Sequence, residues 1–145
     1  KVHEYYLNKG KGFFHAAPYK LPDSEANAVI TFDVNKDKKP DLVFGNNGPN
    51  AVLINQGGGT FAVENNRLPG LKKVTQDLAA ADVDGDGDLD IFEANEDGNA
   101  LLLNNGKGFF TDATATHLPN DLNIKTRKAS VADVDKDGDP DLFLS

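Results

Sequence analysis

The chain contains the acidic segment Asp82-Val-Asp-Gly-Asp-Gly-Asp-Leu-Asp90 and close copies of it on either side. The copies are Asp33-Val-Asn-Lys-Asp-Lys-Lys-Pro-Asp41 and Asp133-Val-Asp-Lys-Asp-Gly-Asp-Pro-Asp141, and all three align without gaps. We call them loop 1 (33–41), loop 2 (82–90) and loop 3 (133–141). They begin 49 and 51 residues apart. Self-similarity at a period of about 20–50 residues is typical of a repeat architecture.

Two further markers recur in a fixed order along the chain. The first is Asn-x-Gly-x-Gly-x-Phe, which we call the Asn-Gly signature and which spans 8–14, 55–61 and 104–110. Where a loop precedes it, its Asn lies 22 residues after the first Asp of that loop. The second marker is a Leu-Pro pair that follows Lys20, Arg67 or His117. Three markers in one order indicate true internal repeats.

Each unit is predicted to form four short strands. The Asn-Gly signature is suited to the hairpin turn between the third and fourth strands, because glycine reaches positive φ without steric cost. Four antiparallel strands in about 50 residues is the size of one β-propeller blade. The first strands are the apolar runs before the loops, 28–32, 78–81 and 129–132, and the second strands are the runs after them, 42–44, 91–92 and 142–144. The third strands are the runs 5–7, 51–54 and 100–103, and the fourth strands begin at Phe13, Phe61 and Phe109.

The predicted fold class is therefore all-β, with β-propeller blades of four antiparallel strands and about three repeat units. We expect one tandem-repeat segment over 1–145. Propellers typically have four to eight blades, so we expect either part of a larger propeller or an assembly of copies, and we favour the first. The expected units are approximately 1–25 (partial), 26–70, 71–120 and 121–145 (partial).

The composition excludes several functions. The chain has no cysteine, which rules out disulfides, zinc-thiolate sites and thiol catalysis. Its net charge of -8 argues against nucleic acid or an anionic membrane as a partner. No stretch approaches the roughly 20 apolar residues that a membrane span needs.

The loops offer the ligands that calcium prefers. Side-chain oxygens at positions 1, 3 and 5, a backbone carbonyl at position 7 and a carboxylate at position 9 can surround one ion. Calcium takes six to eight oxygen ligands at about 2.3–2.6 Å, whereas magnesium demands near-octahedral geometry and keeps its waters. The loops hold 13 of the 23 acidic residues, so without a cation they would crowd like charges. A solvated acidic turn is the alternative, but three loops in register favour metal.

The three loops are not equivalent. Gly87 and Gly138 occupy position 6, where the backbone must turn sharply, but loop 1 has Lys38 there and Lys39 beside it. A non-glycine residue at positive φ costs about 1 kcal/mol or more, and the lysines weaken the local field. We therefore expect two Ca²⁺ sites and a weak or absent third. The candidate metal ligands are Asp82, Asp84, Asp86, Asp88 and Asp90 in loop 2, Asp133, Asp135, Asp137, Asp139 and Asp141 in loop 3, and Asp33, Asn35, Asp37, Lys39 and Asp41 in loop 1.

An EF-hand is the rival interpretation, because the segment from Asp82 to Glu93 matches its loop pattern. We reject it on the other two loops, which place Phe44 and Leu144 where that Glu falls. The flanks are rich in Gly and Asn and leave no room for paired helices. Glu93 is expected on the surface of the second strand.

The order of these motifs resembles the FG-GAP/VCBS repeat family. The matching pattern is D-x-D-x-D-G-x-x-D, an apolar strand and then L-x-N-x-G-x-G-x-F. Repeats of this family build integrin-α-like propellers and propellers of many secreted bacterial proteins. The resemblance implies a calcium ion between the first two strands of a blade, on the five acidic positions of loop 2 and of loop 3. Loop 1 departs at Asn35, Lys38 and Lys39. Phe44-Gly45 is the one literal echo of the integrin form.

The function expected from this is an extracellular, calcium-binding structural, adhesion or filament scaffold without catalysis. Millimolar calcium outside cells favours an extracellular or cell-surface location. The expected partners are other repeats of the same or a neighbouring chain, and an extracellular protein or glycan.

The alternative is a carbohydrate-binding or polysaccharide-processing propeller, a lectin or a lyase. The histidines do not suggest a catalytic set, and His117 is expected on the surface. The tyrosines near the N-terminus could stack on a sugar ring, although such residues more often pack in a core. They are Tyr5, Tyr6 and Tyr19.

Overall fold

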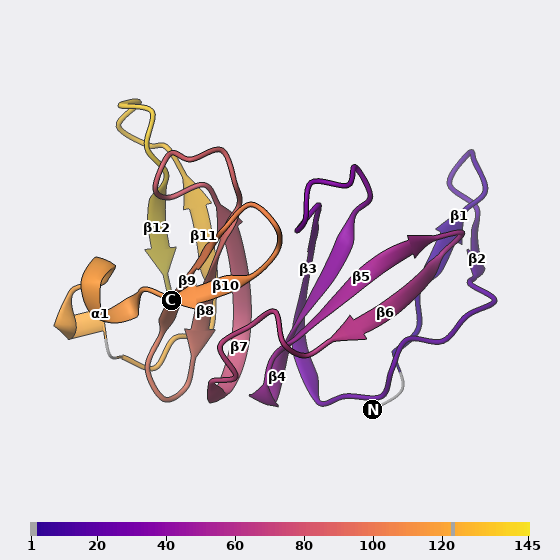
Figure 1. The fold of residues 1–145 in the computed structure, drawn as a ribbon, viewed down its shortest axis with the longest axis horizontal. Coiled ribbons are helices and arrows are strands. Elements are labelled where there is room, and N and C mark those ends of the chain that lie inside the picture. The colour runs from indigo at the N-terminus through magenta and orange to yellow at the C-terminus, as the bar shows by residue number, and fades with distance from the viewer. Residues whose placement is uncertain (1–2, 123) are drawn as a thin grey trace.

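The computed structural model describes residues 3–122 and 124–145 and confirms the all-β prediction (Figure 1). A short helix, α1 (Thr114–His117), and a 3-10 turn (Asn120–Leu122) follow β10 and were not predicted. No helix in the described part of the chain is long and apolar enough to cross a membrane. The strands are β1 (Tyr6–Asn8), β2 (Phe14–Ala16), β3 (Ala26–Phe32), β4 (Asp41–Pro49), β5 (Ala51–Gly57), β6 (Thr60–Glu64), β7 (Lys72–Ala81), β8 (Asp90–Asn95), β9 (Ala100–Asn104), β10 (Phe110–Asp112), β11 (Ala129–Ala132) and β12 (Asp141–Leu144).

Each complete unit folds as one antiparallel blade of four strands. Blade 1 has the order β3-β4-β5-β6, and blade 2 has the order β7-β8-β9-β10. Their registers correspond, because Leu42 faces Leu53 and Ile91 faces Leu102 at the same distance after each loop. The pair β1–β2 holds the places of third and fourth strands, and β11–β12 holds those of first and second strands.

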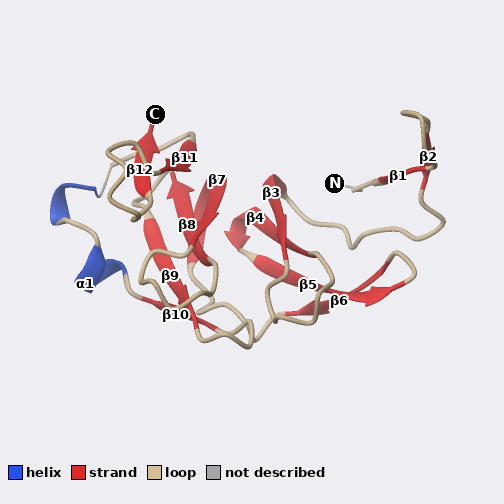
Figure 2. Cartoon of the chain, turned by 90° about the horizontal axis from the view of Figure 1, so that it is seen from above, coloured by secondary structure: helices blue, strands red, loops and turns tan. Residues whose placement is uncertain are grey.

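The blades stand in a curved row rather than a closed ring (Figure 2). The first strands of successive units pack together, with β7 between β3 and β11. β4 also pairs with β7 through Asn47↔Val74 and Gly48↔Lys73, so hydrogen bonds join the two complete blades. The arrangement is that of a partial β-propeller.

The main apolar core lies between blades 1 and 2. It is formed from alternate side chains of the central strands, as expected where one face of each sheet is covered by the next. Two smaller clusters pack Tyr5 and Phe61 at one end of the row, and Phe92 with the β11–β12 pair at the other. The main cluster is Phe32, Val34, Val43, Val52, Ile54, Leu78, Ile91, Ala100, Leu102 and Phe110.

The asparagine of the Asn-Gly signature ties each hairpin turn to the acidic loop of its own blade. Asn55 donates through Nδ2 to the carbonyl of Pro40 at 2.8 Å, and its Oδ1 accepts from the amide of Gly57 at 2.8 Å. Asn104 donates to the carbonyl of Leu89 at 3.2 Å. The two recurring motifs therefore form one structural unit, which explains their fixed spacing.

A pair of asparagines also recurs at the opposite end of each complete blade, and the sequence analysis missed it. Asn46 and Asn50 build the turn between β4 and β5, and Asn95 and Asn99 build the same turn one unit later. Asn50 reaches the hydroxyl of Thr75 in the next blade at 3.0 Å. Asn99 likewise reaches the hydroxyl of Thr126 at 2.8 Å. These bonds latch neighbouring units together. The sequence did contain a signal for this pair, because its two copies lie 49 residues apart, as loops 1 and 2 do.

The prediction that Glu93 lies on the surface is wrong. Its side chain is only 2% exposed, and its Oε1 accepts a 2.7 Å hydrogen bond from Asn50 across the boundary between the blades. Burial raises the pKa of the Glu93 carboxyl above its ordinary value. Its place on the second strand was correct, but that face of β8 is covered by blade 1. Alternation along one strand cannot reveal a neighbouring blade.

Candidate metal centres

The three acidic loops lie along one edge of the curved row, one loop in each unit, at the top of Figure 1. Each connects the first and second strands of its unit: β3 to β4, β7 to β8 and β11 to β12. The repeat thus places three equivalent candidate sites side by side, one in each successive unit.

The carboxylate at position 1 shapes each loop. Both oxygens of Asp82 accept backbone hydrogen bonds, from Gly85 at 2.8 Å and from Gly87 at 2.9 Å. Asp133 accepts from the amides at the same two positions of loop 3, at 2.7 and 3.1 Å. The amides fold the backbone around the carboxylate and leave the later side chains around a common centre.

Two backbone positions in each loop have positive φ, rather than the single one predicted. Position 6 has φ of 68° at Lys38, 87° at Gly87 and 102° at Gly138. Position 4 also lies in this region, with 61° at Lys36 and 65° at Lys136. Loop 1 therefore adopts the same path as the others with a strained lysine at both positions, whereas loop 3 has one such lysine and loop 2 has none.

In loops 2 and 3, carboxylates converge closely enough to share one ion. Oxygens of Asp82, Asp84 and Asp86 lie within 4.8 Å of one another, and so do those of Asp133, Asp135 and Asp141. Hard carboxylate oxygens at this spacing fit a calcium ion. Within the described residues, loop 1 shows no such group. The expected order of calcium affinity among the three loops stays a prediction.

The position-9 carboxylates also hold the strands of each blade together. Asp90 accepts from the amides of Val83 at 3.0 Å and Asn104 at 2.8 Å. Asp41 accepts from the equivalent amides in blade 1 at 3.0 and 2.8 Å. Both are fully buried, and burial raises the pKa of each. Asp141 makes the first of these bonds, to Val134 at 2.9 Å. A bound cation would offset the cost of burying these charges.

The other candidate ligands have different surroundings. Asp88 is 7% exposed and forms an ion pair with Lys36 of loop 1. Asp139 is exposed, and its amide bonds Asp137 at 2.9 Å. In loop 1, the Asn35 side chain accepts from the amide of Asp37 at 3.1 Å.

The lysine at position 7 is the main difference in loop 1. The Nζ of Lys39 donates to Asp37 at 2.8 Å and to the carbonyl of Asn55 at 3.3 Å. The hydrogen bond to Lys39 lowers the pKa of Asp37. The ammonium therefore occupies an oxygen of the position-5 carboxylate, and in loop 2 the carboxylate at this position, Asp86, belongs to the cluster.

Of the residues considered for an enzyme or lectin, His3 and Tyr5 line one pocket, together with Glu4. His3 contacts Ser24 and Phe44, whereas His117 lies on the surface, as predicted. Tyr5 bonds the carbonyl of Gly59 and packs against Phe61, which is the structural role considered for it.

Arg67 shows a role that the sequence analysis missed. It is buried, and its guanidinium donates to the carbonyls of Lys107 at 2.8 Å and Gly108 at 3.1 Å in the next blade. It also pairs with Glu64 and lies over the ring of Phe109. The equivalent Lys20 and His117 are exposed. The Leu-Pro marker therefore did not predict the burial of the residue before it.

Comparison with known proteins agrees with the motifs and the fold. A search of curated proteins finds no match to the chain. A family model for FG-GAP-like repeats matches residues 33–93 and again residues 82–144. The first match begins at loop 1 and the second at loop 2, so both follow the unit defined by the loops. The chain belongs to the FG-GAP-like repeat family.

Proposed function

We propose that the chain is a calcium-binding scaffold module of an extracellular adhesion, matrix or filament protein, without catalytic activity of its own. One observation carries the proposal: a carboxylate cluster recurs in two equivalent loops, at positions 1, 3 and 5 of loop 2 (Asp82, Asp84, Asp86) and at positions 1, 3 and 9 of loop 3 (Asp133, Asp135, Asp141). Each lies at the junction of the first two strands of its unit. An ion held there would fasten those strands to each other.

The physical effect of calcium would be on stability. Without a cation, the clustered carboxylates repel one another, and the buried Asp90 adds to the strain on loop 2. A ligand that binds only the folded chain stabilises it by about 2.7 kcal/mol per site at 100 times its Kd. Extracellular modules typically bind calcium at about 10⁻⁴–10⁻³ M. With a Kd in this range, millimolar calcium would stabilise the chain by about 0.4–1.4 kcal/mol per site, so the effect would depend on a location where calcium is millimolar.

The proposed partners are other repeats. In the complete blades, the position-9 carboxylate accepts from the amide of the Asn that begins the Asn-Gly signature. Asp141 lies on β12, which pairs with β11 on one side. A third strand with an Asn-Gly signature, from the same or a neighbouring chain, would complete that blade. An extracellular protein or glycan would then bind the assembled surface.

Thermal unfolding tests this function. Calcium is expected to raise the melting temperature of the chelated chain by several degrees, and Asp84→Asn and Asp135→Asn are each expected to reduce that rise. Asp23→Asn is the control, because Asp23 is an exposed acid outside the loops. An equal melting temperature in EDTA and in millimolar calcium would refute the proposal.

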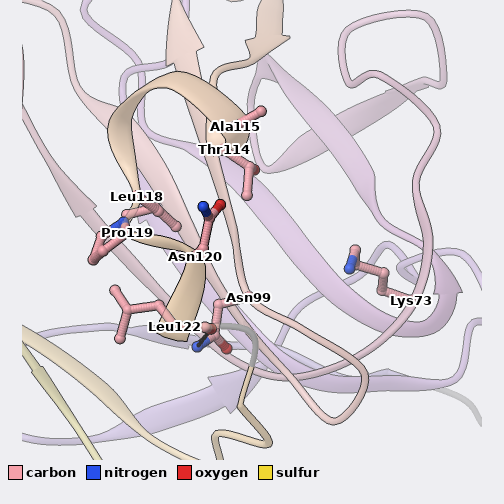
Figure 3. A pocket seen from close by; sticks show the side chains of 8 residues that line it. All are labelled: Lys73, Asn99, Thr114, Ala115, Leu118, Pro119, Asn120 and Leu122. Carbon is pink, nitrogen blue, oxygen red and sulfur yellow. Dashed lines mark hydrogen bonds between the residues drawn. The ribbon is translucent and has the colours of Figure 1, made fainter.

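A carbohydrate-binding role is the second candidate, and one pocket favours it. The pocket has a volume of about 290 Å³ and lies beside α1 (Figure 3). Its wall combines Lys73, Thr114 and Asn120, which could bond sugar hydroxyls, with the apolar Leu118. A glycan array tests this role. Binding that Asn120→Ala abolishes would support it, and an array without signal would refute it.

A further inference from the structure

We propose that loop 1 is a metal-independent loop whose resident cation is the ammonium group of Lys39. The inference goes beyond the proposed function, because it holds whether or not loops 2 and 3 bind calcium. It starts from charge. Loop 1 has three aspartates and three lysines, so its formal charge is zero, whereas loop 2 has five aspartates and no lysine.

The three lysines of loop 1 have different positions. Lys36 points out of the loop and forms its ion pair with Asp88 in loop 2. Lys38 is exposed, and among the described residues its Nζ has no ion pair. Lys39 alone turns its ammonium back onto the carboxylates of its own loop.

One of the two contacts of Lys39, at position 5, is a contact that a cation in this loop would make. Its Nζ donates to Asp37 at position 5 and to the carbonyl of Asn55, the first residue of the Asn-Gly signature. The hydrogen bond to Asp37 raises the pKa of Lys39, and the charges of Asp41 and Asp33 add to this effect. The ammonium therefore lies against the carboxylate at position 5. Loop 2 also receives a lysine, because Lys36 pairs with Asp88 at position 7, but that lysine comes from loop 1.

An ammonium differs from calcium in what it can do. It donates three hydrogen bonds and carries one charge, so it neutralises a loop with few carboxylates without an ion from solution. Loop 1 needs less charge because Asn35 replaces a carboxylate. The Lys39 side chain remains 45% exposed, so its effect on stability is expected to be small.

The test compares Lys39→Gln with Lys38→Gln. Both remove one positive charge from the same loop, but only the first removes the proposed cation. In EDTA, Lys39→Gln is expected to melt roughly 1–4 °C below Lys38→Gln. Millimolar calcium is expected to narrow this gap, because the loop is then open to a metal. Lys39→Arg keeps the charge and is expected to melt close to the unmodified chain.

Three outcomes would overturn the inference. The glutamine variants could melt together in EDTA, calcium could stabilise the unmodified chain and still leave the gap between these variants unchanged, or Lys39→Arg could melt with Lys39→Gln. Failure of the proposed function would look different. Calcium would then leave the melting temperatures of the unmodified chain and of Lys38→Gln unchanged, while Lys39→Gln would still melt below Lys38→Gln in EDTA.

Discussion

The first asparagine of the Asn-Gly signature occurs three times, as Asn8, Asn55 and Asn104, and its surroundings differ each time. Replacing each of them with alanine should therefore give three different losses of stability. Asn104 is buried between the blades. It donates to the carbonyl of Val34 in loop 1 at 3.1 Å and accepts from the amide of Gly108 at 3.1 Å, and both bonds are buried. Asn8 makes one exposed bond, to the amide of Gly10 at 2.8 Å.

The magnitudes follow from these environments. A buried polar group left without its partner costs about 1–3 kcal/mol, and Asn104→Ala removes a partner from two such groups. We expect a loss of roughly 2–5 kcal/mol in the free energy of unfolding. Asn55→Ala removes one exposed and one half-buried bond and should cost about 1 kcal/mol. Asn8→Ala should cost less than about 0.5 kcal/mol, as an exposed substitution does.

Urea unfolding followed by far-UV circular dichroism measures these differences, since the chain has no tryptophan. EDTA should be present throughout, because a metal bound to the loops would add its own stabilisation. The expected order of destabilisation is Asn104, then Asn55, then Asn8. If Asn104→Ala fell within about 0.5 kcal/mol of Asn8→Ala, the claim that this side chain joins the two blades would be wrong.

Two further predictions concern buried charges. The pKa of Glu93 is higher in the folded chain than in the unfolded chain. At a pH between these two pKa values, the folded chain therefore binds more protons than the unfolded chain. The free energy of unfolding in EDTA should fall as the pH rises through this window. Glu93→Gln should flatten that slope and raise the melting temperature at neutral pH, and an unchanged slope would contradict this. Arg67→Ala should lower the free energy of unfolding in urea by roughly 2–4 kcal/mol. Lys20→Ala, at the equivalent exposed position, should lower it by under about 0.5 kcal/mol. Equal losses would refute the role of Arg67 in joining the two blades.

The sequence predicted what is local to one repeat. The first strand of the last unit, Ala129–Ala132, has the predicted bounds, and the glycines of the Asn-Gly signature adopt positive φ as expected. The backbone of loop 1 could also be placed, because its nine residues align with loops that have glycine at position 6. Repetition supplied three examples of each element and so reduced the ambiguity of any single one.

What the sequence did not predict lies between the repeats. Glu93 and Arg67 are both buried by the neighbouring blade, although charged residues are rarely buried without partners. The partners of Glu93 and Lys36 are 43 and 52 residues distant, at Asn50 and Asp88. Periodicity along one strand reports one face of one sheet, and it carries no information on which blade covers that face.

A crystal structure determined in millimolar calcium tests the central claim most directly. We expect a spherical density feature in loop 2 and in loop 3, with six to eight oxygens at about 2.3–2.6 Å and an anomalous signal that identifies calcium. Loop 1 should instead show the ammonium of Lys39 beside Asp37. Loops 2 and 3 without a bound ion under these conditions would contradict the account.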